Sequence, residues 1–221
     1  MLKRCLFFVH VAFFLMTSCS QGERIVVDVA QPLLQNACHK CVIVIDPGHG
    51  GFDIGARVQR VKEKVLALQT ANLVKKHLHS KGYRVVLTRS RDVFVPLERR
   101  SAIANATKGH LFVSIHFNAF KRVHVKGVEV YYYDKGPKWR QVASKKLAQI
   151  VLNKMVCATH AFSRGIKPGN FHVVRETQMP AILVEGGFLT NSQERYCLKS
   201  KKYIDKVASS ISDAIDQYCH Q

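Results

Sequence analysis

Short apolar runs alternate with longer amphipathic stretches along most of this 221-residue chain. The first run, Val42 to Ile45, is apolar at every position, which is typical of a strand buried on both faces of a sheet. Strands alternating with helical stretches predict an α/β fold, a single domain whose twisted, mostly parallel sheet is flanked by helices. Further strands are expected at 84–88, 111–115, 127–133 (a candidate edge strand) and 181–184, and helices at 62–79, from Pro96, at 139–157 and at 200–218.

The first twenty residues depart from this pattern. Lys3 and Arg4 precede an apolar run from Leu6 to Met16, and small residues follow it. A basic start, a short apolar core and small residues are typical of a secretory signal peptide. The run is shorter than the roughly 20 apolar residues that a membrane span needs. We therefore expect an exported protein of the periplasm or cell envelope.

Two processing outcomes fit this segment. Cleavage after Ser20 releases a soluble protein, whereas cleavage before Cys19 makes that cysteine a lipidated membrane anchor. Residues 21–41 show no useful periodicity, and we interpret them as a short tether. No repeat, linker or low-complexity tract divides 42–219, so this range is predicted to be one catalytic domain.

The amino-acid composition and the net charge indicate what kind of partner this chain can bind. The chain is 47% hydrophobic and 22% charged, which is ordinary for a globular protein and excludes disordered and fibrous classes. Its 34 Lys and Arg against 15 Asp and Glu give a formal charge of +19, which predicts a polyanionic neighbour. An exported protein does not usually meet nucleic acid. The basic residues are also scattered along the chain and do not cluster with aromatic residues as in a nucleic-acid-binding module. We expect no nucleic-acid binding; an anionic membrane or an acidic envelope polymer remains.

Export also affects how the cysteines are interpreted. Five follow residue 20, and an odd number leaves at least one thiol without an intramolecular partner. Cys38 and Cys41 form a CxxC pair that lacks the second pair of ligands of a structural zinc site. A small-loop disulfide fits this pair, with a redox motif as the alternative. The five are Cys38, Cys41, Cys157, Cys197 and Cys219.

Four titratable residues fall at or near the carboxyl ends of expected strands, where reactive groups gather in an open α/β sheet. His49 follows the first strand, His116 closes the third and Glu185 closes the last, while Glu63 begins the helix after a glycine-rich loop. Two imidazoles and one carboxylate leave a coordination position for water, as in a catalytic zinc site. The remaining carboxylate is then available as a general base.

Each of these residues has a structural alternative. His49 fits a solvated turn, His116 a hydrogen-bonded core position, and Glu63 a first-turn residue favoured by the helix dipole. Glu185 is harder to explain in this way, because a carboxylate at a buried strand end is costly unless it is paired or bound to metal.

The order of the motifs adds a family resemblance. Residues 46–56, DPGHGGFDIGA, resemble the opening signature of the zinc-dependent N-acetylmuramoyl-L-alanine amidases of the amidase_3 family. Further blocks follow in family order up to Asn191, namely Glu63-Lys64, Leu87-Thr88-Arg89 with Arg100, residues 114–119 (SIHFNA), 174–176 (VRE) and 180–191 (PAILVEGGFLTN).

The resemblance implies specific roles. Its metal ligands fall on His49, Glu63 and His116, which implies one zinc ion per chain, and its catalytic carboxylate falls on Glu185. The chain departs from the family at the basic stretch 57–62 and at Phe117, which replaces a smaller residue. We expect both departures to reshape the groove without touching the ligands.

The implied activity is a peptidoglycan hydrolase that cleaves the amide between N-acetylmuramic acid and the L-alanine of the stem peptide, in cell-wall remodelling and daughter-cell separation. Residues 138–179 hold one clear helix, which leaves little chain for the inhibitory helix of some members. We therefore expect an open, monomeric catalytic domain, with any activator protein unidentified. A protein that binds peptidoglycan without cutting it is the alternative.

Overall fold

The computed structural model describes residues 41–221. The predicted signal peptide, nearly all of the predicted tether and Cys38 lie outside this range and stay predictions. Within it, Cys157 and Cys197 carry free thiols. None of the helices in the described range combines the length and the apolar character that crossing a bilayer requires.

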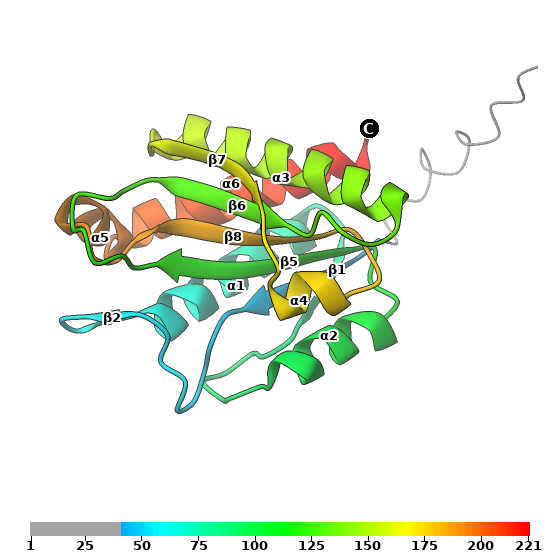
Figure 1. Ribbon diagram of the computed structural model, residues 1–221, viewed down its shortest axis with the longest axis horizontal. Coiled ribbons are helices and arrows are strands. Elements are labelled where there is room, and N and C mark those ends of the chain that lie inside the picture. Colours follow the sequence, from blue (N-terminus) through cyan, green and yellow to red (C-terminus); the bar gives the residue numbers. More distant parts are fainter. Residues whose placement is uncertain (1–40) are drawn as a thin grey trace, which may run out of the picture. The chain divides into compact units, whose positions relative to one another are not determined.

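Six strands form the central sheet in the order β4-β1-β5-β8-β6-β7 (Figure 1). The first four run parallel to one another, β6 is antiparallel to β8, and β7 is parallel to β6. This confirms the predicted mostly parallel α/β sheet. The strands are β1 Val42–Pro47, β4 Arg84–Leu87, β5 Leu111–Asn118, β6 Val128–Tyr132, β7 Ser163–Pro168 and β8 Ala181–Phe188, and β2 Arg57–Val58 pairs with β3 Val61–Lys62 in a separate hairpin.

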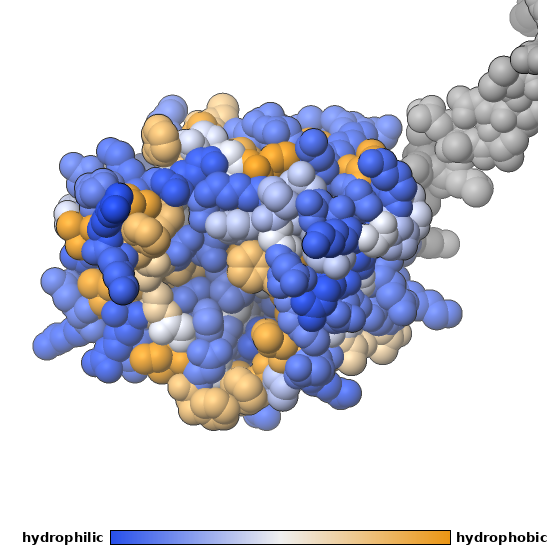
Figure 2. Space-filling view, viewed as in Figure 1, coloured by the Kyte–Doolittle hydropathy of each residue, from blue (hydrophilic) through white to orange (hydrophobic). Residues whose placement is uncertain are grey.

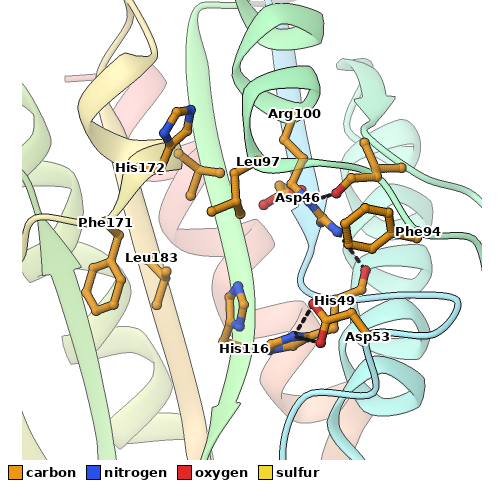
Figure 3. Close-up of a pocket in the computed structure, with 12 residues that line it drawn as sticks. Asp46, His49, Asp53, Phe94, Leu97, Arg100, His116, Phe171, His172 and Leu183 are labelled. Carbon is orange, nitrogen blue, oxygen red and sulfur yellow. Dashed lines mark hydrogen bonds and ion pairs between the residues drawn. The ribbon is translucent and has the colours of Figure 1, made fainter.

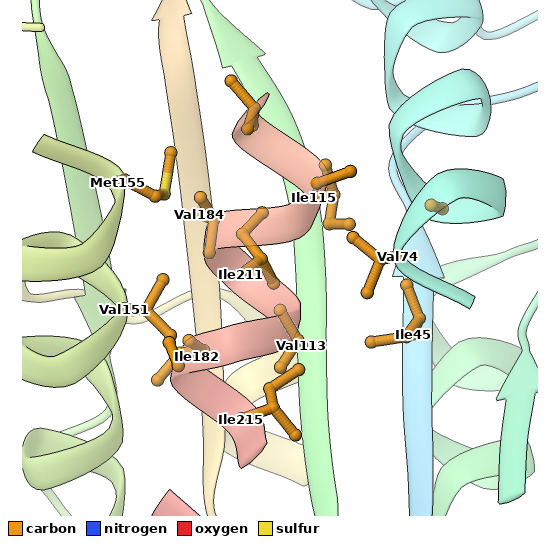
Figure 4. Packing of buried hydrophobic residues seen from close by; sticks show 14 of the residues in the cluster. Ile45, Val74, Val113, Ile115, Val151, Met155, Ile182, Val184, Ile211 and Ile215 are labelled. Carbon is orange, nitrogen blue, oxygen red and sulfur yellow. The ribbon is translucent and has the colours of Figure 1, made fainter. Parts of the chain in front are cut away.

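Helices cover both faces of the sheet. The long helices α1, α3 and α6 pack on one face, and the shorter α2 and α4 lie together in front of the other (Figure 1). Figure 4 shows the larger core, where apolar side chains of β5 and β8 meet those of α1, α3 and α6. The helices are α1 Glu63–Ser80, α2 Leu97–Ala106, α3 Lys138–Thr159, α4 His172–Glu176, α5 Ser192–Leu198 and α6 Lys201–Cys219.

The predicted elements form where the sequence pattern places them. All six residues of β1 are buried, because β4 and β5 flank it and helices cover both of its faces. Helix α1 begins at Glu63, an acidic first-turn residue, and ends one residue before Lys81. Gly82, with a φ of 87°, then turns the chain toward β4.

Some sequence expectations were wrong. Residues 127–133 do not form an edge strand, because β7 lies outside β6. β5 and β8 continue past His116 and Glu185, so these residues lie within their strands instead of closing them. Phe117 is fully buried in the larger core, on the opposite side of β5 from His116, and does not reshape the groove.

The surface of the face that carries α2 and α4 is mostly hydrophilic, with apolar side chains among the polar ones (Figure 2). This face also carries the side chains of Asp46, Ser114, His116 and Glu185, since alternate residues of a strand project to the same side. The short helices leave part of the sheet uncovered at the carboxyl end of its parallel strands. The functional site lies there.

Candidate metal centre and catalytic cavity

His49, Glu63 and His116 come together at one point. One donor atom from each lies within 4.8 Å of the others. Glu63 Oε1 is 3.0 Å from His49 Nε2 and 2.8 Å from His116 Nδ1. The fold thus unites three residues from a loop, a helix start and a strand, as the sequence predicted. Two imidazole nitrogens and a carboxylate oxygen are the donor set of a catalytic zinc site.

The loop after β1 presents His49. This residue has a left-handed backbone with a φ of 58°, which a non-glycine residue adopts only when its surroundings enforce it. Its Nδ1 lies 2.9 Å from both carboxylate oxygens of Asp53. That bond fixes the ring and leaves Nε2 directed toward the cluster, an arrangement common for metal-binding histidines. Asp53 was not among the predicted site residues, although it lies four residues after His49 in the opening motif.

Two buried arginines hold this loop from below. Arg100 Nη1 donates to Pro47 O at 2.6 Å and Nη2 to His49 O at 2.7 Å. Arg89 Nη2 donates to Gly48 O at 2.7 Å. Only 3% of each arginine is exposed. They therefore act on the site through backbone carbonyls and not through the reacting groups.

Asp46 balances the charge of Arg100. Its Oδ1 lies 2.8 Å from Arg100 Nη1, and its Oδ2 accepts a 2.7 Å bond from Ser114 Oγ. Burial alone would raise the pKa of Asp46, but Arg100 and the hydroxyls of Thr88 and Ser114 outweigh it and hold the pKa below its usual value. The carboxylate is therefore ionised and belongs to the supporting network.

Glu63 is almost completely buried and remains ionised. Its Oε2 accepts a 2.8 Å bond from the Ala56 N–H, and Oε1 a 3.2 Å bond from the Phe117 N–H. Burial would raise the pKa of Glu63, but the bonds to His116 and His49 outweigh burial and place the pKa well below its ordinary value. A metal ligand must be deprotonated, and Glu63 meets that requirement.

Glu185 lies beside this cluster in a different state. It pairs in register with His116 across β8 and β5. Its Oε2 is buried and has no hydrogen-bond partner within residues 41–221. Burial, followed by the nearby charges of Glu63 and Glu129, raises the pKa of Glu185 well above its usual value. A carboxyl group with a buried, unpaired oxygen and a raised pKa is suited to proton transfer.

A cavity of about 410 Å³ opens beside the two histidines. Figure 3 shows Phe171 and Leu183 on one side of His116 and Phe94 on the other. Phe94 stacks on the exposed Phe52 ring with centroids 4.1 Å apart. The cavity is lined by Asp46, His49, Asp53, Phe94, Val95, Leu97, Arg100, His116, Phe171, His172, Val173 and Leu183.

The fold and the four convergent side chains are typical of a hydrolase that uses a metal-activated water. Residues 43–217 match the family model described as N-acetylmuramoyl-L-alanine amidase, and the chain belongs to that family. This confirms the resemblance predicted from the ordered motifs.

Individual proteins and solved structures are also similar to this chain. The chain is 36% identical to the uncharacterized protein YqiI of Bacillus subtilis over 81% of this chain and 85% of that protein. It is also 36% identical to the amidase LytC of the same organism, over 80% of this chain but only 35% of LytC. Among solved structures, an N-acetylmuramoyl-L-alanine amidase from Clostridium difficile 630 superimposes with a TM-score of 0.77 at 37% identity, covering 81% and 97% of the two chains. AmiC2 of Nostoc punctiforme gives 0.77 at 36% identity, covering 82% and 98%.

Proposed function

We propose that this protein is a peptidoglycan hydrolase that cleaves the amide between N-acetylmuramic acid and the L-alanine of the stem peptide. The observation that carries this proposal is the cluster of His49, Glu63 and His116 beside Glu185, in a chain of the amidase family. A pure binding protein has no need of a carboxyl group with a buried, unpaired oxygen next to such a cluster.

The cluster fits a single zinc ion. His49 Nε2, His116 Nδ1 and a Glu63 oxygen would hold it, and Asp53 fixes the His49 ring. When bound, zinc supplies a water of lowered pKa and polarises the scissile carbonyl. The cavity beside His49 and His116 offers room for a substrate next to these ligands.

Glu185 carries the proton transfers. Its carboxylate takes a proton from the attacking water as the new C–O bond forms. It then gives that proton to the departing L-alanine nitrogen as the C–N bond breaks, so one residue acts first as base and then as acid. The register that pairs Glu185 with His116 across β8 and β5 supports this role, because both side chains then project from the same face of the sheet.

The site is accessible without the removal of a plug. The side chains of His49 and His116 are 23% and 18% exposed. Between β6 and β8 the described chain contains α3, β7 and α4, and α4 forms a wall of the cavity without filling it. We therefore propose an enzyme that is active as a monomer. A solved relative at 27% identity, CwlD from Clostridioides difficile, is in complex with the lipoprotein GerS.

The charge and the relatives favour action on the cell wall. Among the similar proteins is a probable cell wall amidase, LytH, of Staphylococcus epidermidis. We propose export to the periplasm or envelope, with a lipid anchor at Cys19 as one form, and a role in wall remodelling and daughter-cell separation. The excess of Lys and Arg then holds the enzyme near stem-peptide carboxylates and anionic lipid.

Mass spectrometry of purified peptidoglycan after digestion tests the proposal. The zinc-loaded protein should release stem peptides with a free L-alanine amino group and leave intact glycan strands. A chelator should stop release, and added zinc should restore it. Cleavage of a different bond, or binding to sacculi without any release by the zinc-loaded protein, would overturn the proposal.

A further inference from the structure

A buried glutamate anchors two cations near the site. Glu129 of β6 is only 3% exposed. Its Oε2 accepts from Arg164 Nε at 2.8 Å and from Lys167 Nζ at 2.5 Å. Its Oε1 accepts from Asn118 Nδ2 and Tyr131 OH. The glutamate is thus fully hydrogen bonded, and it fixes two long side chains of β7 that would otherwise be mobile on the surface.

These cations share the sheet face of the candidate metal centre. In register, His116 of β5 lies opposite Glu185 of β8, and Glu185 lies opposite Glu129 of β6. Residues paired in this way project from the same face. β7 is the next strand, so its backbone lies two strand spacings from Glu185, or roughly 10 Å. Glu129 draws the cationic groups of Arg164 and Lys167 back from β7 to a position over β6, one strand from Glu185 and on the side away from His116.

Arg164 retains unused donors. Only its Nε binds Glu129, and within residues 41–221 neither of its Nη atoms has a hydrogen-bond acceptor. The guanidinium lies 5.1 Å from the centroid of the Phe188 ring, which holds its plane, and the side chain is 29% exposed. Lys167, 35% exposed, lies over the Tyr131 ring. Arg164 and Lys167 share the single carboxylate of Glu129. The two cations together can therefore bind a second anion.

The chemistry assigned to Glu185 indicates which part of the substrate passes this edge. The group that protonates the departing nitrogen must face it, so the peptide leaves on the Glu185 side of the cluster, toward β6 and β7. An extended peptide covers about 3.3–3.6 Å per residue. The α-carboxylate of the second stem residue then lies roughly 7 Å from the scissile nitrogen, within reach of a side chain held over β6.

We propose that Arg164, with Lys167 beside it, binds the α-carboxylate of the second residue of the stem peptide and so selects stems in which that group is not amidated. This inference rests on the proposed amidase function. A planar guanidinium with two free Nη groups suits a carboxylate, which it can bind through two parallel hydrogen bonds. A carboxamide offers one acceptor and no charge, so it binds this site more weakly.

Two synthetic muramyl tripeptides with amidated C-termini test this subsite. They differ only in the second residue, which is D-glutamate with a free α-carboxylate or D-isoglutamine with an α-carboxamide. The zinc-loaded wild type should show a kcat/KM at least tenfold higher for the carboxylate form, mainly through KM. Arg164→Ala should lower kcat/KM for that form by 10- to 100-fold and for the carboxamide form by less than threefold.

Controls separate recognition from folding. Lys154→Ala removes a charge from the exposed surface of α3 and should leave both values and their ratio unchanged. Arg164→Lys keeps a cation without the planar fork and should give an intermediate ratio. Equal losses on both substrates in Arg164→Ala, or a wild type without preference, would overturn the subsite while leaving the amidase function intact. A wild type that cleaves neither tripeptide nor sacculi would overturn both.

Discussion

Arg100 and Asp46 form an ion pair of 2.8 Å that is 3% and 1% exposed on its two sides, directly beneath the loop that presents His49. The same guanidinium binds the carbonyls of Pro47 and His49. The pair therefore does more than neutralise charge, because it sets the path of the backbone between β1 and the candidate ligand.

Replacement of Arg100 by lysine tests that link. A lysine keeps the charge, but its three N–H donors sit on one nitrogen and cannot replace a planar fork that binds four acceptors, the carbonyls of Val95, Pro47 and His49 and the carboxylate of Asp46. We therefore expect Arg100→Lys to lower the free energy of unfolding by about 2–4 kcal/mol and to weaken zinc binding by about 10- to 100-fold. Thermal unfolding and zinc competition with a chelator measure the two effects. Arg99→Lys, on the exposed side of the same helix, is the matched control. A loss of stability with unchanged zinc affinity would show that the Arg100–Asp46 pair does not position the metal site.

The carboxyl partner predicts a dependence on pH. Because the pKa of Asp46 is lowered in the folded protein, its stabilising contribution is present above its unfolded pKa of about 4 and is lost as the pH falls through the folded value. Asp46→Asn should therefore be about 3 kcal/mol less stable than wild type at pH 7, and the difference should shrink at pH 3. Urea unfolding at the two pH values measures it, with the exposed Asp134→Asn as the control. A difference that stays constant with pH would contradict this assignment.

Local sequence patterns were sufficient to predict the four candidate site residues. His49, His116 and Glu185 each come after a run of apolar residues, and Glu63 starts a helix. The apolar runs and the helix start were enough to nominate the four residues, although His116 and Glu185 lie within their strands and not at the ends. The ion pair beneath the loop that presents His49 could not be predicted in this way. Asp46 and Arg100 are 54 residues apart, and no periodicity links such a pair.

The sequence did not predict strand β7 for a similar reason, since its formation depends on a distant part of the chain. Residues 163–168 read Ser-Arg-Gly-Ile-Lys-Pro, with one large apolar residue, a glycine and a terminal proline. Such a segment forms a strand because β6 offers it an unpaired edge, and its polar side chains suit an edge position. The sequence pattern does not predict β7, and it therefore predicts neither the inner position of β6 nor the association of Arg164 and Lys167 with Glu129.

Glu185 can be separated from the ligands by an isosteric change. Glu185→Gln removes proton transfer but none of the three donor atoms, so we expect wild-type zinc content with turnover reduced by about 10²–10⁴. His116→Ala should lose both zinc and turnover. Metal analysis with stem-peptide release from sacculi distinguishes the two variants, and Glu98→Gln on the exposed surface of α2 serves as the control. Undiminished release by Glu185→Gln would remove it from the mechanism.

Gly48 gives the sharpest steric test of the cluster. A Cβ at this position would lie 2.6 Å from His116 Nδ1 and closer still to Cε1, so Gly48→Ala must displace the ring whose Nδ1 faces Glu63. The three atoms nearest to that Cβ all belong to the His116 ring, and the backbone of Gly48 needs no left-handed conformation. We expect a folded protein with zinc affinity reduced at least 100-fold and no measurable release of stem peptide.

Gly109→Ala is the matched crowding variant, because its Cβ would meet Val44 Cγ2 at 2.7 Å in the core and not a ligand. Overpacking there should cost about 1–3 kcal/mol of stability while zinc affinity stays at the wild-type value. Isothermal titration with zinc, run beside thermal unfolding of both variants, compares them directly. If Gly48→Ala bound zinc as tightly as Gly109→Ala, His116 would not be a ligand, because a ring forced from its place cannot keep the geometry that the metal requires.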